Sequence, residues 1–256
     1  MKIEERKQDG YTQELRVSDV SPAYINSLRR TFMSKVPTMA VDYVEISEND
    51  SALYDEIIAH RVGLVVLNTD LEGYNMPEEG ADESPATHVK LSLEVEGPKT
   101  VYASDFESKD PNITPVHEKT PIVELMENQS LKMVATARLN TGKEHAKHQT
   151  GAISYYYKPH ITVDNDADEL NDVIDEYPPQ VIEDGEIKEE KIDEPNLIEA
   201  CEDVSDVVTI EYDNPHRDFV FKIESWGQLD PEDIVEKGIS LFNEELESFR
   251  EQMKNT

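Results

Sequence analysis

Cysteine and basic side chains are both scarce in this sequence of 256 residues. Cys201 is the single cysteine, so no disulfide can form within the chain and no set of thiolates can hold zinc or an iron–sulfur cluster. Only 24 Lys and Arg stand against 56 Asp and Glu, which gives a formal net charge of −32. A module that binds DNA or RNA by itself needs concentrated positive charge for phosphate contacts, so the composition argues against that class.

Long apolar runs are missing as well. The longest aliphatic run, Leu64 to Leu67, is far shorter than the roughly 20 residues of a membrane-spanning helix. The first five residues lack the apolar core of a signal peptide. We therefore expect a soluble, cytoplasmic protein. Its acidity is typical of halophilic proteins, which rely on high salt to screen their self-repulsion; an ordinary soluble protein with a disordered acidic tract is the alternative.

Negative charge is concentrated in one part of the chain and absent from two others. Residues 161–214 hold 20 Asp or Glu and 2 Lys. Residues 20–41 contain no acidic residue, and residues 128–160 contain only Glu144. Because Lys and Arg are almost never fully buried without a partner, we interpret these two acid-poor segments as surfaces covered by other polypeptides. Burial of both segments in the protein's own core is the alternative.

Hydrophobic periodicity predicts an α+β chain. Ser21 as N-cap and Pro22 at the first helical position begin a helix that ends before Pro37. A second, short helix is expected over 52–62 and a third over 168–175. Strands are predicted over 13–17, 38–46, 63–67 and 219–223, with a loop over 68–87. Three β-rich segments, 88–95, 131–139 and 153–163, predict an antiparallel sheet.

The clearest predicted element is a long C-terminal helix. Asp230 supplies its N-cap and Pro231 its first residue. Apolar residues then recur at alternating steps of four and three, the spacing of a coiled-coil seam. We interpret this seam as a dimerisation surface for a helix of another chain, and packing on the protein's own sheet is the alternative. The seam consists of Val235, Ile239, Phe242, Leu246, Phe249 and Met253.

Motifs that carry chemistry are weak in this sequence. His145 and His148, beside Glu144, are of the residue types that bind zinc, but the adjacent lysines would repel a cation and no third ligand is evident. We interpret this segment as a solvated or partner-contacting loop. Phosphate-binding glycine loops and nucleophile elbows do not occur. We therefore expect neither catalytic residues nor a metal site on this chain.

Several segments resemble a known family. They lie over 26–32, 36–41, 54–64, 142–147 and 221–232, where the sequence reads NSLRRTF, VPTMAV, YDEIIAHRVGL, GKEHAK and FKIESWGQLDPE. The first two resemble the signature of the alpha-like assembly subunits of multisubunit RNA polymerases. The next two resemble the archaeal and eukaryotic branch of that family, and the last looks like its return strand and dimerisation helix. The chain as a whole looks like the archaeal D subunits of this family, and its acidity suggests a haloarchaeal member.

The resemblance implies a discontinuous alpha-like dimerisation domain (1–47 and 206–256), an inserted β-rich domain (48–160) and an acidic insertion (161–205). It implies pairing with a smaller alpha-like subunit, L, recruitment of the small subunits N and P, and docking of the large B subunit. Nucleotidyl transfer would belong to the assembled DNA-directed RNA polymerase and its two largest subunits. The seam of the last helix would cross subunit L. Contacts with the large B subunit would fall on Arg29, Arg30, Lys35, Lys143, His145 and Lys147.

The acidic insertion departs from some of these relatives. Certain D subunits carry there a ferredoxin-like domain whose cysteines hold an iron–sulfur cluster, whereas residues 161–205 keep only Cys201. We therefore expect no cluster and no other cofactor. Two interpretations of residues 161–205 stay open: a cluster-free domain and a mostly disordered loop. Packing is favoured by the apolar residues Ile174, Tyr177, Val181, Ile182 and Ile187.

Two functions of other classes compete with the assembly role. A stand-alone metal-dependent hydrolase would use Glu144, His145 and His148. An acidic chaperone or DNA-mimicking adaptor would use residues 161–214. Metal analysis distinguishes the hydrolase from the assembly role, and deletion of the acidic stretch distinguishes the adaptor from it.

Overall fold

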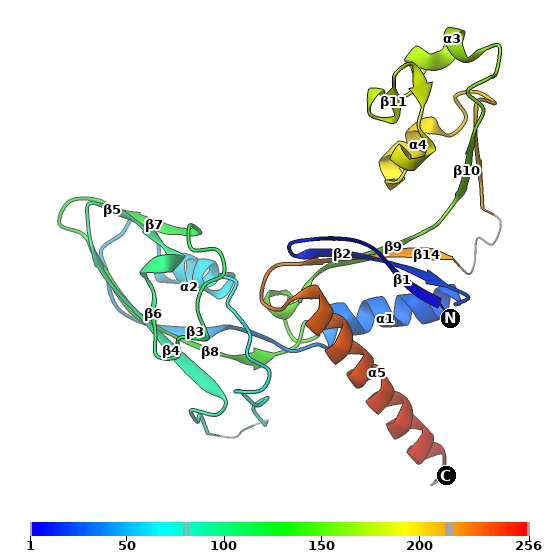
Figure 1. The fold of residues 1–256 in the computed structure, drawn as a ribbon. Coiled ribbons are helices and arrows are strands. Elements are labelled where there is room, and N and C mark those ends of the chain that lie inside the picture. Colours follow the sequence, from blue (N-terminus) through cyan, green and yellow to red (C-terminus); the bar gives the residue numbers. More distant parts are fainter. Residues whose placement is uncertain (1, 79, 81, 213–217, 255–256) are drawn as a thin grey trace. The chain divides into compact units, whose positions relative to one another are not determined.

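The computed structural model describes residues 2–78, 80, 82–212 and 218–254, and shows a mixed α/β chain with several antiparallel sheets. Two compact units can be distinguished. Unit 1 comprises Met1–Arg6, Glu14–Ile25 and Tyr155–Phe221, and unit 2 comprises Lys7–Gln13, Asn26–Ser154 and Lys222–Thr256. Figure 1 labels most of the helices and strands of both units. No helix in the described ranges is long and apolar enough to cross a membrane.

The two ends of the chain contribute to one four-stranded sheet in the order β1-β2-β14-β9. Its strands are β1 (Lys2–Asp9), β2 (Thr12–Ser18), β14 (Phe219–Ser225) and β9 (Gly151–Tyr157). Helix α1 (Pro22–Ser34) begins as predicted, because the Ser21 hydroxyl accepts a hydrogen bond from the backbone N–H of Tyr24 at 3.3 Å. Helix α5 (Pro231–Lys254) is the longest helix described. The strands predicted over 13–17 and 219–223 are therefore confirmed, as is the C-terminal helix.

A second sheet of unit 2 has the order β3-β8-β4-β6. Its members, β3 (Thr38–Asn49), β8 (Ser130–Asn140), β4 (His88–Glu96) and β6 (Glu107–Ser108), pair antiparallel. Residues of this sheet form one apolar core with helix α2 (Asp55–Gly63) and with the strand pair β5 (Lys99–Tyr102) and β7 (Pro121–Leu125). A 3₁₀ turn (Ala103–Asp105) follows β5. The alternation of buried and exposed residues in β4 and β8 produces this core face.

Two predictions about strands were wrong. Residues 63–67 form only an isolated bridge between Leu67 and Pro115, since no strand of the described ranges pairs along this segment. The apolar pattern that suggested a strand arises from burial of Val65 and Leu67 in the core. The segment 153–163 does not continue the sheet of β4 and β8. Pro159, which lacks an N–H to donate, separates β9 from β10 (His160–Val163), and β9 lies in the other sheet.

The acidic insertion is a small packed domain within unit 1. Strand β10 pairs with β13 (Val208–Glu211), so the chain enters and leaves the insertion through one antiparallel ladder. Between them lie α3 (Leu170–Val173), the hairpin β11 (Ile182–Glu183) and β12 (Glu186–Ile187), α4 (Pro195–Cys201), and 3₁₀ turns at Ile174–Glu176, Pro179–Val181 and Glu189–Lys191 (Figure 1). Ten buried side chains form its core: Ile161, Leu170, Tyr177, Val181, Ile187, Ile192, Ile198, Cys201, Val207 and Val208.

Candidate subunit interfaces

The two acid-poor segments of the sequence meet in unit 2, where residues 141–150 form a loop against the end of α1 and the start of β3. We call this segment the 141–150 loop. The backbone N–H of Lys143 donates to the carbonyl oxygen of Ser34 at 3.0 Å. Nδ1 of His148 lies 2.8 Å from the carbonyl oxygen of Thr38. Segments about 110 residues apart in the chain thus form one surface.

Gly142 allows this close approach. A Cβ atom at Gly142 would lie 2.9 Å from the carbonyl oxygen of Met33 and 2.8 Å from Cγ of Gln149, which is closer than real Cβ contacts. At the other end of the loop, the hydroxyl of Thr150 donates to the carbonyl oxygen of Phe32 at 2.9 Å. The last turn of α1 therefore holds the 141–150 loop at two places.

The turn that follows β14 joins the same junction. Nε2 of Gln228 donates to the carbonyl oxygen of Gln149 at 2.9 Å. The backbone N–H of Trp226 donates to the carbonyl oxygen of Thr150 at 3.2 Å. The carbonyl oxygen of Gln228 in turn accepts the backbone N–H of Thr69 at 2.9 Å. Gln228 is only 4% exposed, so its side chain has a structural role: its hydrogen bond holds the turn after β14 against the 141–150 loop. We call such buried, hydrogen-bonded polar residues buried ties.

Helix α2 borders the other side of the 141–150 loop. A small cavity of about 130 Å³ lies between β3, α2 and the loop. His60 and Leu64 line it from α2, and His145 and Lys147 line it from the loop. The segments that carry the family resemblance, far apart in the sequence, therefore surround a single region of unit 2.

Four of the six residues expected at a subunit interface lie at or near the surface of this region. Arg30, Lys143 and His145 are exposed. Arg29 is half-buried, and its Nε donates to Oδ1 of Asn26 at 3.1 Å. Arginine at such a position can bind a carboxylate through two parallel hydrogen bonds, which suits an acidic or carbonyl-rich partner.

The other two cations interact within the chain. Lys35, directly after α1, forms an ion pair with Glu245 of α5. The Lys147 side chain is only 14% exposed; its Nζ donates to the carbonyl oxygen of Val41 at 2.7 Å and lies 3.9 Å from Oδ1 of Asp42. Burial lowers the pKa of Lys147, and the charge of Asp42 counteracts that shift. These partners are distant in the sequence, and no local pattern predicts them.

The histidines of the loop are engaged with the backbone. Burial lowers the pKa of His148 to about 4, although its hydrogen bond to the carbonyl of Thr38 favours the charged form. The imidazole is therefore neutral at pH 7. Nδ1 of His145 accepts the backbone N–H of Lys147 at 3.1 Å. Among the described residues no group of three or more His, Cys, Asp or Glu could hold a metal ion, so the geometry gives the hydrolase alternative no support.

The seam of α5 changes character along the helix. Val235 and Phe242 are half-buried, and Gly238 is buried. Towards the C-terminus the seam is increasingly exposed, although its residues are large and apolar. The exposed fractions are 38% for Ile239, 52% for Leu246, 63% for Phe249 and 65% for Met253. Scattered apolar side chains are ordinary on a surface, but a row at heptad spacing indicates a surface for another helix.

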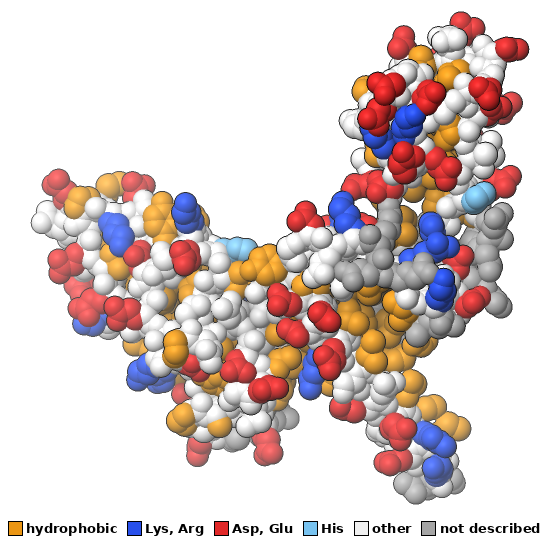
Figure 2. Space-filling model, viewed as in Figure 1, with side chains coloured by type: hydrophobic (Ala, Val, Ile, Leu, Met, Phe, Trp, Pro, Cys, Tyr) orange, Lys and Arg blue, Asp and Glu red, His pale blue; other side chains and the backbone are white. Residues whose placement is uncertain are grey.

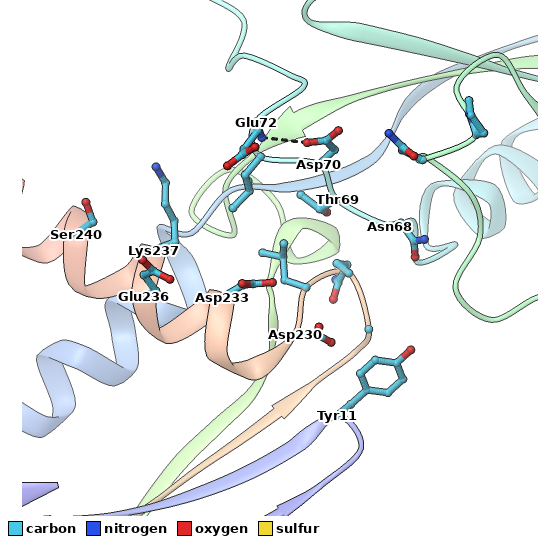
Figure 3. A pocket seen from close by; sticks show the side chains of 16 residues that line it. Tyr11, Asn68, Thr69, Asp70, Glu72, Asp230, Asp233, Glu236, Lys237 and Ser240 are labelled. Carbon is cyan, nitrogen blue, oxygen red and sulfur yellow. Dashed lines mark hydrogen bonds between the residues drawn. The ribbon is translucent and has the colours of Figure 1, made fainter. Parts of the chain in front are cut away.

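An acidic groove of about 950 Å³ lies beside the start of α5 (Figure 3). Its carboxylates come from a loop after α2, from Asp230 directly before α5 and from α5 itself. In that loop, Asp70 accepts the backbone N–H groups of Glu72 and Gly73 at 3.0 and 2.8 Å. Acidic side chains are also spread over the face shown in Figure 2. A groove of this charge disfavours nucleotide phosphates. The charged groups that line it are Asp70, Glu72, Asp230, Asp233, Glu236 and Lys237.

Comparisons with known proteins agree with the resemblance drawn from the motifs. The family model of the RNA polymerase Rpb3/RpoA insert domain matches residues 44–165. The "DNA-directed RNA polymerase subunit Rpo3" of Methanosphaera stadtmanae is 34% identical over 261 residues, 97% of each chain. The chain belongs to the Rpo3 family. The protein of the same name from Methanosarcina acetivorans is 39% identical over 86% of this chain and 85% of its own. That from Thermococcus kodakarensis is 47% identical over 59% and 57%.

Membership of the Rpo3 family makes this chain a subunit of a multisubunit archaeal RNA polymerase, and the resemblance stated from the sequence is confirmed. The functional residues that the sequence analysis missed are the buried ties. The hydroxyl of the fully buried Thr150 and the side-chain amide of the nearly buried Gln228 each donate to a backbone carbonyl. Their signal in the sequence is only a polar residue beside a motif, which by itself does not distinguish a tie from a surface residue. The haloarchaeal source stays a prediction.

Proposed function

We propose that this Rpo3-family chain is the assembly platform of its polymerase. It pairs through α5 with the smaller alpha-like subunit L, docks the large B subunit on the region around the 141–150 loop, and recruits the small subunits N and P. Catalytic residues belong to other subunits, and the complex works in the cytoplasm. The observation that carries this proposal is the exposed apolar seam at the end of α5.

The exposed part of the seam has the geometry that helix pairing needs. Leu246, Phe249 and Met253 lie at successive steps of three and four, so they share one side of α5. Full burial of such side chains contributes roughly 1.5–3 kcal/mol each. Polar residues occupy the intervening positions of this part of the helix, so the apolar row is narrow, as in a two-helix seam.

The region around the 141–150 loop supports docking of a second partner. In a chain of net charge −32, the side chains exposed here include the cations Arg30 and Lys143 and the imidazole of His145. Charges of this kind select partners and orient them more than they add affinity. An acidic or carbonyl-rich surface on the large B subunit would complement them.

The iron–sulfur cluster of some relatives does not fit this chain. Cys201 is the single cysteine, is fully buried among apolar side chains of the acidic insertion, and has its pKa raised by burial. A thiol in such surroundings is a poor metal ligand, because ligation needs the thiolate. We propose that the apolar core stabilises the insertion in place of a cluster. Iron and labile sulfide analysis of the purified chain tests this, and a stoichiometric signal would overturn it.

Pairing through α5 is tested by substitution in the exposed seam. The full chain is co-expressed with subunit L, and complex formation is measured by co-purification and titration. We expect Phe249→Asp to weaken pairing by about tenfold or more, since a buried unpaired charge replaces an apolar contact. Asn243→Asp introduces the same charge on an exposed position of α5 outside the seam and should leave pairing unchanged. Equal pairing by both variants would contradict the proposal.

Docking of the large B subunit is tested separately. Arg30→Glu should leave pairing with L intact and abolish co-purification of the large B subunit from the reconstituted assembly. Lys109→Glu makes the same change of charge at another exposed position of unit 2 and serves as the control. Normal recovery of the large B subunit with Arg30→Glu would exclude Arg30 from the docking surface.

A further inference from the structure

We propose that the end of α1 positions α5 for pairing, through Phe32 against Gly238 and through the ion pair of Lys35 with Glu245. This inference rests on the proposed pairing function and names the residues that set the direction of the pairing helix. It assigns Lys35 to α5 instead of to the large B subunit.

The first contact is a close helix crossing at Gly238. A Cβ atom at this position would lie 2.2 Å from Cδ1 and 2.7 Å from Cε1 of Phe32, so a side chain there would force the helices apart. Phe32 is only 3% exposed, so its ring is buried. Glycine inside a helix is unfavourable relative to alanine. The close approach to Phe32 supplies the physical reason for glycine at this point.

The second contact lies further along both segments. Lys35 follows Phe32 by three residues, and Glu245 follows Gly238 by seven, which is two helical turns or about 10 Å along α5. Two contacts separated in this way fix the direction of a helix, whereas one would leave it able to pivot. The backbone N–H of Lys35 donates to the carbonyl oxygen of Thr31 at 2.9 Å, so Lys35 extends the last turn of α1.

The most exposed part of the seam begins directly after the second contact, although Ile239, before that contact, is already 38% exposed. Leu246, Phe249 and Met253 are more than half exposed, while Val235 and Phe242, before Glu245, are half-buried. The seam therefore has a proximal part that lies against the chain itself and a distal part that meets the partner. Because the distal part extends from the two contacts, a shift at Gly238 displaces every partner-facing residue.

The decisive variant is Gly238→Ala in the full chain, with the affinity for subunit L as the readout. Helix propensity alone predicts that alanine strengthens α5 and leaves pairing unchanged or improved. The proposal predicts the opposite sign, a loss of about tenfold in affinity, since overpacking displaces the helix. Ser240→Ala, at an exposed position of the same helix, is the matched control and should not change the affinity.

A second substitution shows whether the loss arises from the contact itself. Phe32→Leu removes the ring atoms that the new methyl group of Gly238→Ala would meet, so the double variant should recover pairing to within about threefold of the wild type. The thermal midpoint of the isolated chain is measured alongside. Unchanged pairing by Gly238→Ala, or a double variant no better than Gly238→Ala alone, would overturn the proposal.

The ion pair gives an independent test that does not depend on a well-folded Gly238 variant. Lys35→Glu and Glu245→Lys should each weaken pairing by up to about fivefold at low ionic strength, and the exchanged pair should restore it. If both single variants and the exchanged pair bind subunit L with the affinity of the wild type, the second contact is removed from the proposal. If Phe249→Asp fails to weaken pairing, the proposed function itself is wrong. If Phe249→Asp weakens pairing but neither Gly238→Ala nor the charge variants do, only the positioning role is wrong.

Discussion

Nδ1 of His148 lies 2.8 Å from the carbonyl oxygen of Thr38, and this contact joins the 141–150 loop to the first residue of β3. Nε2 of the same ring is enclosed in protein and has no hydrogen-bond partner among the residues that the structure describes. Nδ1 must carry the proton to bond with a carbonyl, so the ring is the neutral tautomer with hydrogen at Nδ1. Adding a second proton would place a charge on Nε2 where no group of the described ranges accepts its hydrogen.

This geometry predicts an acid-sensitive stability. The pKa of His148 is about 4 in the folded chain, against an ordinary value of 6.5, so between these values the unfolded chain binds a proton that the folded chain does not. The contribution is complete above pH 6.5 and is lost as the pH falls towards 4, by roughly 3 kcal/mol in total. Denaturant unfolding between about pH 4.5 and 7.5 measures it.

The matched variant for this measurement is His148→Gln, which can still donate to Thr38 and does not titrate. Its free energy of unfolding should fall less steeply than that of the wild type below pH 6.5. Parallel slopes for the two proteins would show that other groups cause the acid sensitivity.

The contact at Gly142 predicts a destabilising Gly142→Ala. The added methyl would press on the carbonyl oxygen of Met33 and on Gln149, and overpacking of this kind costs roughly 1–3 kcal/mol. Gly63→Ala is the control, because a Cβ at Gly63 would meet no described atom within 4 Å. Thermal or denaturant unfolding compares the two, and equal stability would mean that the 141–150 loop moves away from α1 at no cost.

The ladder of β10 and β13 predicts that the acidic insertion can be removed cleanly. Val163 and Val208 are paired residues of this ladder, so an Asn-Gly turn in place of residues 164–207 would close it as a hairpin. We expect the shortened chain to fold and to pair with subunit L at wild-type affinity, because the insertion has its own core within unit 1. Loss of pairing in a folded variant would contradict this expectation and give the insertion a part in pairing.

The elements with strong local signals could be predicted from the sequence. Ser21 and Pro22 mark the start of α1, and Asp230 and Pro231 mark that of α5, because capping depends only on neighbouring residues. Alternation identified β4 and β8, since each has one face in the core. The prediction for 63–67 was wrong because burial of Val65 and Leu67 gives the same apolar pattern as a strand, whether or not a partner strand lies beside it.

The candidate interface was predictable only in part. Acid-poor composition indicated the region around the 141–150 loop, but it could not separate Arg30, which is exposed, from Lys147, whose Nζ bonds to the carbonyl of Val41. Lys35 and Glu245 are 210 residues apart, and such pairs depend on how the chain folds in three dimensions. The same holds for Gly238, whose meaning becomes visible only beside Phe32.

The enclosed sulfhydryl of Cys201 has a practical consequence. Its side chain is inaccessible in the folded insertion, and burial raises its pKa. Maleimide reagents should therefore not react with it near neutral pH. A cysteine engineered at any exposed position would then be the unique attachment point for a fluorophore or spin label. The native sequence is thus already a suitable background for following, in real time and one molecule at a time, how the polymerase is put together.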